Sequence, residues 1–414
     1  MGDGMRMLEG VKVISFNHFL MGPLGAQILG DLGADVIAIE ALGGAFQRNW
    51  SPNDTYVGDE SLLFACANRN KRSLALDLRS EEGKQIARKL IAEADVVSEN
   101  FRPGVMERLG LGYEQAREIN KHIVYASASG YGPDGPYREK PGQDLLVQAL
   151  SGLVAVTGRQ PDGARAVGAS VVDHHGAALL AVGILAALLR ARQTGEGCRV
   201  DVSLLAAALD LQTESLTTYL NGKRPIDIRQ PGNVAGWGMQ GPYGVYPARD
   251  GSIAISLCTN QELGEALEEP ELSAISDEDN FPRREELSSL TERGTRKFTI
   301  AELKERFTAK HVWHMPVNDY EAVEEDPQVQ HNKHIIGVGS AASDATLKLL
   351  SHPIRYDGRS PEIRLAPQPL GAQSRDILAE LGYSHEEVEQ HIKNGVIGTA
   401  EIAPTRKKYE LKRS

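Results

Sequence analysis

The first half of the chain alternates short β-branched, apolar runs with longer stretches of helical periodicity. Strands joined through helices pair in parallel, because each helix carries the chain back across the sheet before the next strand begins. The pattern therefore predicts an α/β fold around a doubly wound parallel sheet. The expected strands are Val11–Phe16, Asp35–Glu40, Asp95–Ser98 and His122–Ser127, and the expected helices include Leu24–Leu32 and Ser80–Glu93.

The loops after these strands are candidate ligand sites, because doubly wound sheets bind ligands beyond the carboxyl ends of their strands. Gly22, Gly25 and Gly30 in and after the first loop do not form the G-x-G-x-x-G pattern of nicotinamide-binding folds. The basic cluster Arg69–Arg72 has two interpretations, a solvated edge or a phosphate clamp. The candidate loops are Asn17–Pro23, Ala41–Arg48, Asn100–Gly104 and Ser129–Gly135.

The length of 414 residues favours two domains over one ordinary core. The composition turns polar and rich in Gly and Pro near Asn221–Gly236. We predict a Rossmann-like large domain formed by both chain ends, residues 1–225 and 331–414, with a small α+β domain inserted at 226–330.

Local patterns predict further strands and helices in the second half of the chain. Tyr243–Ile255 has the pattern of a hairpin with its turn at Asp250-Gly251. Residues 260–310 are charged and helical in pattern, Pro353–Pro369 is punctuated by prolines, and Arg375–Leu381 is expected to be the final helix.

Composition narrows the functional classes. The formal net charge of −11 argues against nucleic-acid binding as the main activity. Three cysteines far apart in the sequence fit a reducing cytoplasm. The chain starts without a signal-peptide core, and the longest apolar run, Ala177–Leu189, has 13 residues, too few to span a bilayer. His311/His314 and His331/His334 lack the carboxylates or cysteines of a known metal pattern. We therefore expect a cytoplasmic protein with no metal, nucleic-acid or membrane partner.

Asp173 is the main candidate for a catalytic residue. It follows the short apolar run Ala169–Val172 and precedes Ala177–Leu189, so it should lie at the start of a buried helix. Backbone N–H groups and the helix dipole favour the ionised carboxylate there, and an ionised carboxylate can act as a nucleophile. The alternative is that Asp173 only caps the helix.

Nine short motifs, spread over nearly the whole chain, are specific as an ordered set although none is specific alone. They are Leu8–Ile14, Gly22-Pro23, Leu29–Ile37, Asn68–Ser73, Glu99–Gly104, Ser129–Pro136, Thr194–Gly197, Pro242–Tyr246 and Pro316–Asp319. In this order they resemble the class III CoA-transferases, the family that includes formyl-CoA, carnitine and bile-acid CoA-transferases.

The resemblance implies a covalent mechanism, since Asp173 falls on the family's nucleophile. Its carboxylate would attack the donor thioester to give a mixed anhydride, and the CoA thiolate would return to form an aspartyl-CoA thioester before the acceptor acid reacts in turn. CoA esters would be substrates, and no cofactor would be bound permanently.

The resemblance implies two further features. Gly238, Met239, Gln240 and Gly241 fall on a mobile glycine loop that covers the active site, although a domain linker is the alternative for this stretch. Family members also form an interlocked homodimer in which each ring-shaped chain is threaded through its partner.

The CoA contacts implied by the resemblance follow the predicted strand ends. Two departures affect them: some members have a glutamine where this chain has Leu20, and an arginine that can contact CoA is here Ala41. The carried-over residues are Leu20, Met21, Leu76, Arg79, Asn100, Phe101, Arg102, Arg108 and Lys140.

Two other activities are alternatives. The same family contains 2-methylacyl-CoA racemases, which carry a histidine directly before the aspartate where this chain has Gln143. Glutamine cannot act as a general base, although His174 and His175 neighbour Asp173. A catalytically silent CoA-binding protein is the second alternative, and the presence of Asp173 argues against it.

Overall fold

The computed structural model describes residues 6–222, 228–229 and 232–401. The chain folds into two compact units. Unit 1 contains residues 1–147, 170–208 and 328–414, and unit 2 contains residues 148–169 and 209–327. The chain thus leaves unit 1 twice and returns to it twice.

Unit 1 is built on a seven-stranded sheet in the order β14-β5-β2-β1-β6-β7-β8. Every neighbouring pair is parallel except β14 with β5, so the predicted parallel α/β sheet is confirmed. The order from β5 to β8 reverses direction between β1 and β6, which is the ligand-binding switch point of a doubly wound sheet. The strands are β1 (Lys12–Phe16), β2 (Asp35–Glu40), β5 (Lys71–Leu76), β6 (Val96–Glu99), β7 (Val124–Ser129), β8 (Arg199–Ser203) and β14 (Ile397–Gly398).

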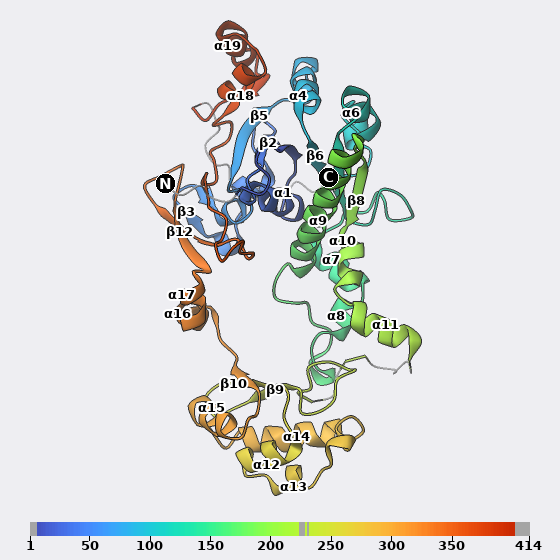
Figure 1. Ribbon diagram of the computed structural model, residues 1–414, viewed down its shortest axis with the longest axis vertical. Coiled ribbons are helices and arrows are strands. Elements are labelled where there is room, and N and C mark those ends of the chain that lie inside the picture. The colour runs from blue at the N-terminus through green and yellow to red at the C-terminus, as the bar shows by residue number, and fades with distance from the viewer. Residues whose placement is uncertain (1–5, 223–227, 230–231, 402–414) are drawn as a thin grey trace. The chain divides into compact units, whose positions relative to one another are not determined.

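One face of this sheet packs on helices from both ends of the chain (Figure 1). Alternate strand residues such as Ile14, Ile37 and Leu74 share one buried cluster with Ile86 and Leu378 from the helices. The last helix in the described part of the chain is α19 rather than the predicted Arg375–Leu381, because a capping box at Ser384 starts one more helix. The helices of this face are α4 (Glu81–Glu93), α5 (Val105–Arg108), α6 (Tyr113–Ile119), α18 (Ser374–Glu380) and α19 (His385–Lys393).

The other face packs on α1 (Met21–Asp31) and α9 (Val171–Thr194), which lie side by side (Figure 1). A Cβ atom added at Gly25 would lie 3.2 Å from the carbonyl oxygen of Ala177 and 3.0 Å from a Leu180 methyl group. Glycine at this position therefore lets the two helices approach closely.

The predicted burial of α9 is only half correct. Its inner face is buried, whereas the outward Val182 and Leu189 are 62% and 61% exposed. The helix extends beyond the apolar run to 24 residues, and by length and composition it could cross a membrane. Core helices of soluble proteins have the same properties, and α9 packs on α1, β7 and β8.

The cluster Arg69–Arg72 is neither a solvated edge nor a phosphate clamp. Arg69 is 5% exposed, and its guanidinium bonds both carboxylate oxygens of Asp31. Lys71 Nζ donates to three acceptors at 2.7–2.9 Å, and burial lowers the pKa of this amine to about 7. Arg72 pairs with Asp35 and Glu380. Both interpretations were wrong because the carboxylates that pair with Arg69 and Arg72 come from distant parts of the sequence and Lys71 is buried.

Unit 2 has its own core around a three-stranded antiparallel sheet in the order β11-β10-β9. The predicted hairpin is confirmed by β9 and β10, which flank Asp250-Gly251. The main elements are β9 (Gly244–Pro247), β10 (Ser252–Ile255), β11 (His314–Pro316), α12 (Asn260–Leu267), α13 (Pro270–Ser273), α14 (Arg284–Thr295) and α15 (Ile300–Ala309).

The remaining elements are short. The domain boundary predicted at 225/226 falls in residues 223–227, outside the described residues. Residues 148–169 and 209–222 were assigned to the large domain but group with unit 2. The short elements include α2 (Phe46–Asn49), α3 (Leu62–Ala65), α7 (Asp144–Leu150), α8 (Leu153–Val156), α10 (Leu204–Asp210), α11 (Thr213–Asn221), α16 (Tyr320–Glu325), α17 (Pro327–Asn332), β3 (Tyr56–Val57), β4 (Glu60–Ser61), β12 (Ile335–Gly339) and β13 (Thr346–Leu350).

Candidate active site

Asp173 lies in the first turn of α9 but does not cap this helix. The N-cap residue is Ser170, whose side chain makes no capping bond, and Asp173 is the third helical residue. The capping bonds come from Asp144 at the start of α7. Its Oδ2 accepts the backbone N–H groups of Val172 at 2.8 Å and Asp173 at 3.0 Å. The alternative that Asp173 is only a cap of its own helix is therefore wrong.

The Asp173 carboxyl instead faces the N-terminus of α1. The side chain of Met21, the first residue of α1, packs on the start of α9, 2.8 Å from a Cβ built at Gly176, and the Met21 N–H favours the ionised form of the carboxyl. Leu20, the N-cap residue of α1, supplies no side-chain cap. Met21 and Asp173, both predicted site residues, are thus neighbours at the switch-point end of the sheet.

The environment of Asp173 raises the pKa of its carboxyl to about 7. Burial is the main cause and the nearby Asp144 carboxylate is the second, whereas the Met21 N–H acts in the opposite direction. The expectation that the helix N-terminus would favour the ionised form was wrong. It failed because burial and a like charge outweigh the dipole and the single backbone bond.

The loop between β1 and α1 is cross-linked to the loop after β6. The backbone N–H of His18 donates to Asn100 Oδ1 at 2.8 Å, and Asn100 Nδ2 donates to the carbonyl of His18 at 2.7 Å. Gly22 completes this contact, since a Cβ there would lie 2.2 Å from Asn17 Oδ1. Both polar atoms of the Asn100 side chain are used in this way, so Asn100 holds the two loops together beside Met21.

Polar atoms in this loop are left unsatisfied. Among the described residues, Asn17 Oδ1 and His18 Nδ1 are buried without a hydrogen-bond partner. Burial lowers the pKa of His18 to about 4, so its imidazole is neutral at physiological pH. Phe19 follows with φ +61°, a conformation that bulky residues rarely adopt, and its N–H is held by Gln47 Oε1 at 3.0 Å.

Two of the predicted CoA-binding arginines lie beyond the ends of β6 and β7. The side chains that line a cavity of about 280 Å³ there include three arginines and three carboxylates, Arg102, Arg138, Arg199, Glu99, Glu107 and Asp201. Guanidinium nitrogens of Arg108 and Arg138 would lie 3.1 and 3.2 Å from a Cβ built at Gly104. The structure therefore brings Arg102 and Arg108 close to Arg138, which the sequence did not single out.

The other predicted CoA residues are more dispersed. Leu76 is 1% exposed and packs in the core, so only its backbone could contact a ligand. Arg79, beyond the end of β5, has a side chain that is 87% exposed and pairs with Asp77 at 2.8 Å. Phe101 packs partly against the core and lies 5.3 Å from the His18 ring. Lys140 is exposed, with Nζ 3.9 Å from the centre of the Tyr137 ring.

The predicted glycine loop belongs to unit 2. The N–H of Met239 bonds the carbonyl of Gly236 at 3.0 Å, and the N–H of Gly241 bonds the carbonyl of Asn280 at 3.0 Å. Gly238 and Gln240 are exposed. Because Asp173 belongs to unit 1, a role of this loop as a cover over the site stays a prediction.

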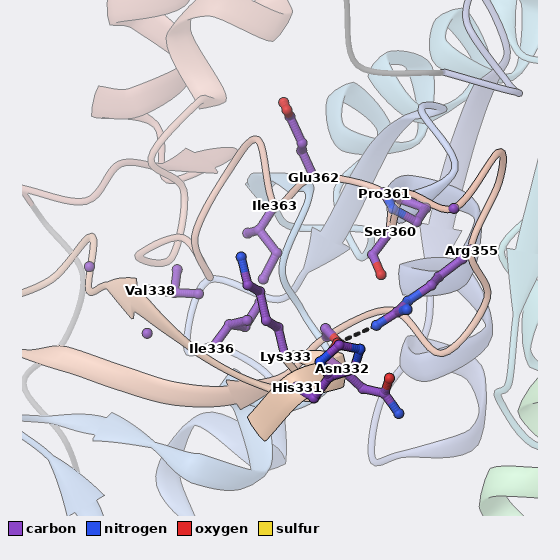
Figure 2. A pocket seen from close by; sticks show the side chains of 14 residues that line it. His331, Asn332, Lys333, Ile336, Val338, Arg355, Ser360, Pro361, Glu362 and Ile363 are labelled. Carbon is purple, nitrogen blue, oxygen red and sulfur yellow. Dashed lines mark hydrogen bonds between the residues drawn. The ribbon is translucent and has the colours of Figure 1, made fainter. Parts of the chain in front are cut away.

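A larger cavity of about 750 Å³ in unit 1 holds none of the predicted site residues (Figure 2). His331, Lys333 and Glu362 line it, and Arg355 in its wall donates to the carbonyl of Asn332 at 2.5 Å. The described residues contain no group of three His, Cys, Asp or Glu side chains that could hold a metal ion. Asp173, by contrast, lies beside the N-terminus of α1 at the switch-point end of the sheet.

Comparison with known proteins identifies the family of the chain. The family model described as CoA-transferase family III matches residues 8–374. A succinyl-CoA:glutarate CoA-transferase from Mus musculus is 32% identical, over 95% of this chain and 91% of its own length. An acetyl-CoA:oxalate CoA-transferase from Acetobacter aceti is 40% identical, over 63% of this chain and 65% of its own length.

A solved structure extends the likeness to three dimensions. The crystal structure of a CAIB/BAIF family protein from Brucella suis is similar with a TM-score of 0.79 and 29% identity, over 90% of this chain and 99% of that one. The chain belongs to CoA-transferase family III and is a CoA-transferase. The racemase alternative is not favoured, since these relatives are named as transferases and Gln143 is exposed without a basic group of its own.

The raised pKa of Asp173 predicts a stability difference between wild type and Asp173→Asn. The pKa of Asp173 is about 7 in the folded state and 3.8 in the unfolded state, so protonation of Asp173 stabilises the folded state. This contribution to the free energy of unfolding is fully present below pH 3.8 and is lost as the pH rises through 7. The amide never ionises. The variant should therefore match wild type near pH 4 and exceed its Tm by about 2 °C or more at pH 8, measured by thermal unfolding. A lower Tm for the variant at pH 8 would contradict the assigned environment of Asp173.

Proposed function

We propose that the protein transfers CoA from an acyl-CoA donor to a free carboxylic acid through covalent intermediates on Asp173. The observation that carries this proposal is the position of the Asp173 carboxyl. It is not occupied in capping its own helix, it lies at the switch point, and it faces the first backbone N–H of α1. A carboxyl with a pKa near 7 is also a more basic nucleophile than an ordinary aspartate once it is ionised.

The first half of the reaction uses the donor. An ionised Asp173 oxygen attacks the thioester carbonyl carbon, the C–S bond breaks, and CoA thiolate leaves a mixed anhydride. The thiolate then attacks the aspartyl carbonyl carbon, which releases the donor acid and forms an aspartyl-CoA thioester. The backbone N–H groups at the uncapped N-terminus of α1 are suited to hold the negative oxygen of each tetrahedral intermediate.

The second half reverses these steps with the acceptor. The acceptor carboxylate attacks the aspartyl thioester, CoA thiolate leaves, and a second anhydride forms. The thiolate attacks the acceptor carbonyl carbon and frees the Asp173 carboxylate. The reaction needs no external oxidant, metal or general base, because every nucleophile is already an anion at the pH where Asp173 is ionised.

The CoA ester would bind along the carboxyl ends of the strands. Leu20 and Met21 border Asp173, and Asn100 holds the loop that leads to Phe101 and Arg102. Guanidinium groups suit the phosphate oxygens of CoA, and Arg102 and Arg108 lie together near Gly104. Arg79 and Lys140 are exposed at other strand ends and would contact the outer parts of the ligand.

We also propose that the enzyme works as a homodimer, interlocked as the family resemblance implies. The exposed Val182 and Leu189 on α9, with Leu145 at 59% exposure on α7, leave apolar side chains of unit 1 uncovered in the single chain. Sedimentation equilibrium should give twice the chain mass of 44.9 kDa. A monomer at micromolar concentration would contradict a dimer held by these surfaces.

Asp173→Asn should abolish transfer and leave CoA-ester binding intact, because an amide cannot form the anhydride. Transfer is measured with the best donor and acceptor from a panel that includes succinyl-CoA, glutarate and oxalate, and binding is measured by calorimetry. Asn at this position keeps the backbone N–H that bonds Asp144, so the helix should form in the variant. Transfer by the variant above about 1% of wild type would argue against covalent catalysis by Asp173.

Arg108→Ala should weaken binding of CoA esters by a factor of about 10–100, the loss of a charge-assisted contact of roughly 1.5–3 kcal/mol. Arg79→Ala should weaken it less, because Asp77 already pairs with Arg79. Arg88→Ala is the matched control, since Arg88 is an arginine on α4 that pairs with Glu81. Equal affinities of Arg108→Ala and Arg88→Ala in calorimetry would remove Arg108 from the CoA site.

A further inference from the structure

Asp144 holds the N-terminus of the helix that carries Asp173. Its Oδ2 accepts from the second and third helical residues, Val172 and Asp173, the positions whose N–H groups an N-cap side chain usually binds. The N-cap residue itself, Ser170, makes no such bond. The cap therefore comes from 28 residues earlier in the sequence and fixes the first turn of α9 to the start of α7.

This arrangement has two consequences for Asp173. The first turn of α9 is satisfied by another residue, so the Asp173 side chain is released from local capping and can face the Met21 N–H of α1. A second negative charge is placed beside the Asp173 carboxyl at the same time. The Asp144 side chain thus both fixes the first turn of α9 and supplies the negative charge beside Asp173.

We propose that Asp144 is a positioning residue of the transfer reaction, which anchors the first turn of α9 and holds a negative charge next to the Asp173 carboxyl. This inference rests on the proposed function, because it matters only if Asp173 is the nucleophile. A negative neighbour keeps the nucleophile more basic, which speeds its attack on a thioester once it is ionised, at the cost of a narrower pH range.

Among the charged groups near Asp173, Asp144 has the largest effect on the charge of its carboxyl. On α1, the described titratable side chain is Asp31 at the far end of the helix. His18 in the preceding loop is neutral because burial lowers its pKa to about 4. On β8, Arg199 pairs with Asp201 at 2.9 Å. His174 and His175 follow Asp173 on α9 and are present in every variant considered below.

Asp144→Asn and Asp144→Ala separate the two roles. The amide oxygen of Asn can still accept the bonds of α9 but carries no charge, and Asn caps helices about as well as Asp. Asp144→Asn should therefore retain transfer at pH 9 and move the acid limb of the kcat/KM profile to lower pH. Asp144→Ala loses the anchor and should lower kcat at every pH by roughly 10- to 100-fold, the scale of a misplaced reacting group.

The protonation state of Asp173 can be measured without an activity assay. Carbodiimide with an amine modifies carboxyls in their protonated form, so the yield of modified Asp173 peptide against pH, measured by mass spectrometry, reports the Asp173 pKa. The midpoint in wild type should lie near 7 and in Asp144→Asn below it. Glu118→Gln is the control for loss of one negative charge, because Glu118 is exposed on α6 on the opposite face of the sheet, and its midpoint should equal that of wild type.

The outcomes decide the inference in each case. A lower midpoint in Asp144→Asn with transfer retained at high pH, and loss of transfer in Asp144→Ala, supports it. An unchanged midpoint in Asp144→Asn, or equal kcat of wild type and a folded Asp144→Ala, overturns it. If Asp144→Ala does not fold, the profile and midpoint of Asp144→Asn still decide. The proposed function can also fail by itself. If Asp144→Asn shifts the midpoint of Asp173 but Asp173→Asn still transfers CoA fully, Asp144 affects the charge of Asp173 but Asp173 is not the nucleophile.

Discussion

The close packing of α1 on the start of α9 brings the Met21 N–H to the Asp173 carboxyl, and the candidate site depends on this packing. It places an ionisable side chain at the uncapped N-terminus of α1, beside the switch point of the parallel sheet. Gly25 lets α1 and α9 approach closely, and Asp144 supplies the cap that Asp173 does not. Burial then raises the pKa of Asp173, so the site holds a basic carboxylate at the expense of stability above neutral pH.

Much of the sheet could be predicted from local sequence. β2 (Asp35–Glu40) has the expected bounds, and β1 and α4 each begin within one residue of the predicted start. A β-branched apolar run marks a buried strand, and an amphipathic pattern marks a helix with one buried face, so both can be recognised from local sequence. Asp173 became the catalytic candidate for a similar reason, since a lone carboxylate before a long apolar stretch is conspicuous. The strand β8 (Arg199–Ser203) was missed because its alternating charges resemble those of a solvated loop.

The electrostatics could not be predicted in the same way, because the partners are far apart in the sequence. Arg69 is neutralised by Asp31, 38 residues away, so a basic cluster that seems solvated is buried. Asp144 caps a helix that begins well after it, and no local pattern marks that contact. The sign of the Asp173 pKa shift follows from burial by tertiary structure, which a helix-dipole argument does not include.

Oxygen labelling tests covalent catalysis by Asp173 most directly. The acceptor acid is supplied with ¹⁸O in both carboxyl oxygens and turned over with unlabelled acyl-CoA, after which the Asp173 peptide is analysed by mass spectrometry. When the acceptor attacks the aspartyl thioester, its oxygen bridges the anhydride, and this oxygen stays on Asp173 when CoA thiolate takes the acyl group. Covalent catalysis therefore predicts ¹⁸O in the Asp173 carboxyl, whereas turnover that leaves this peptide unlabelled would contradict it.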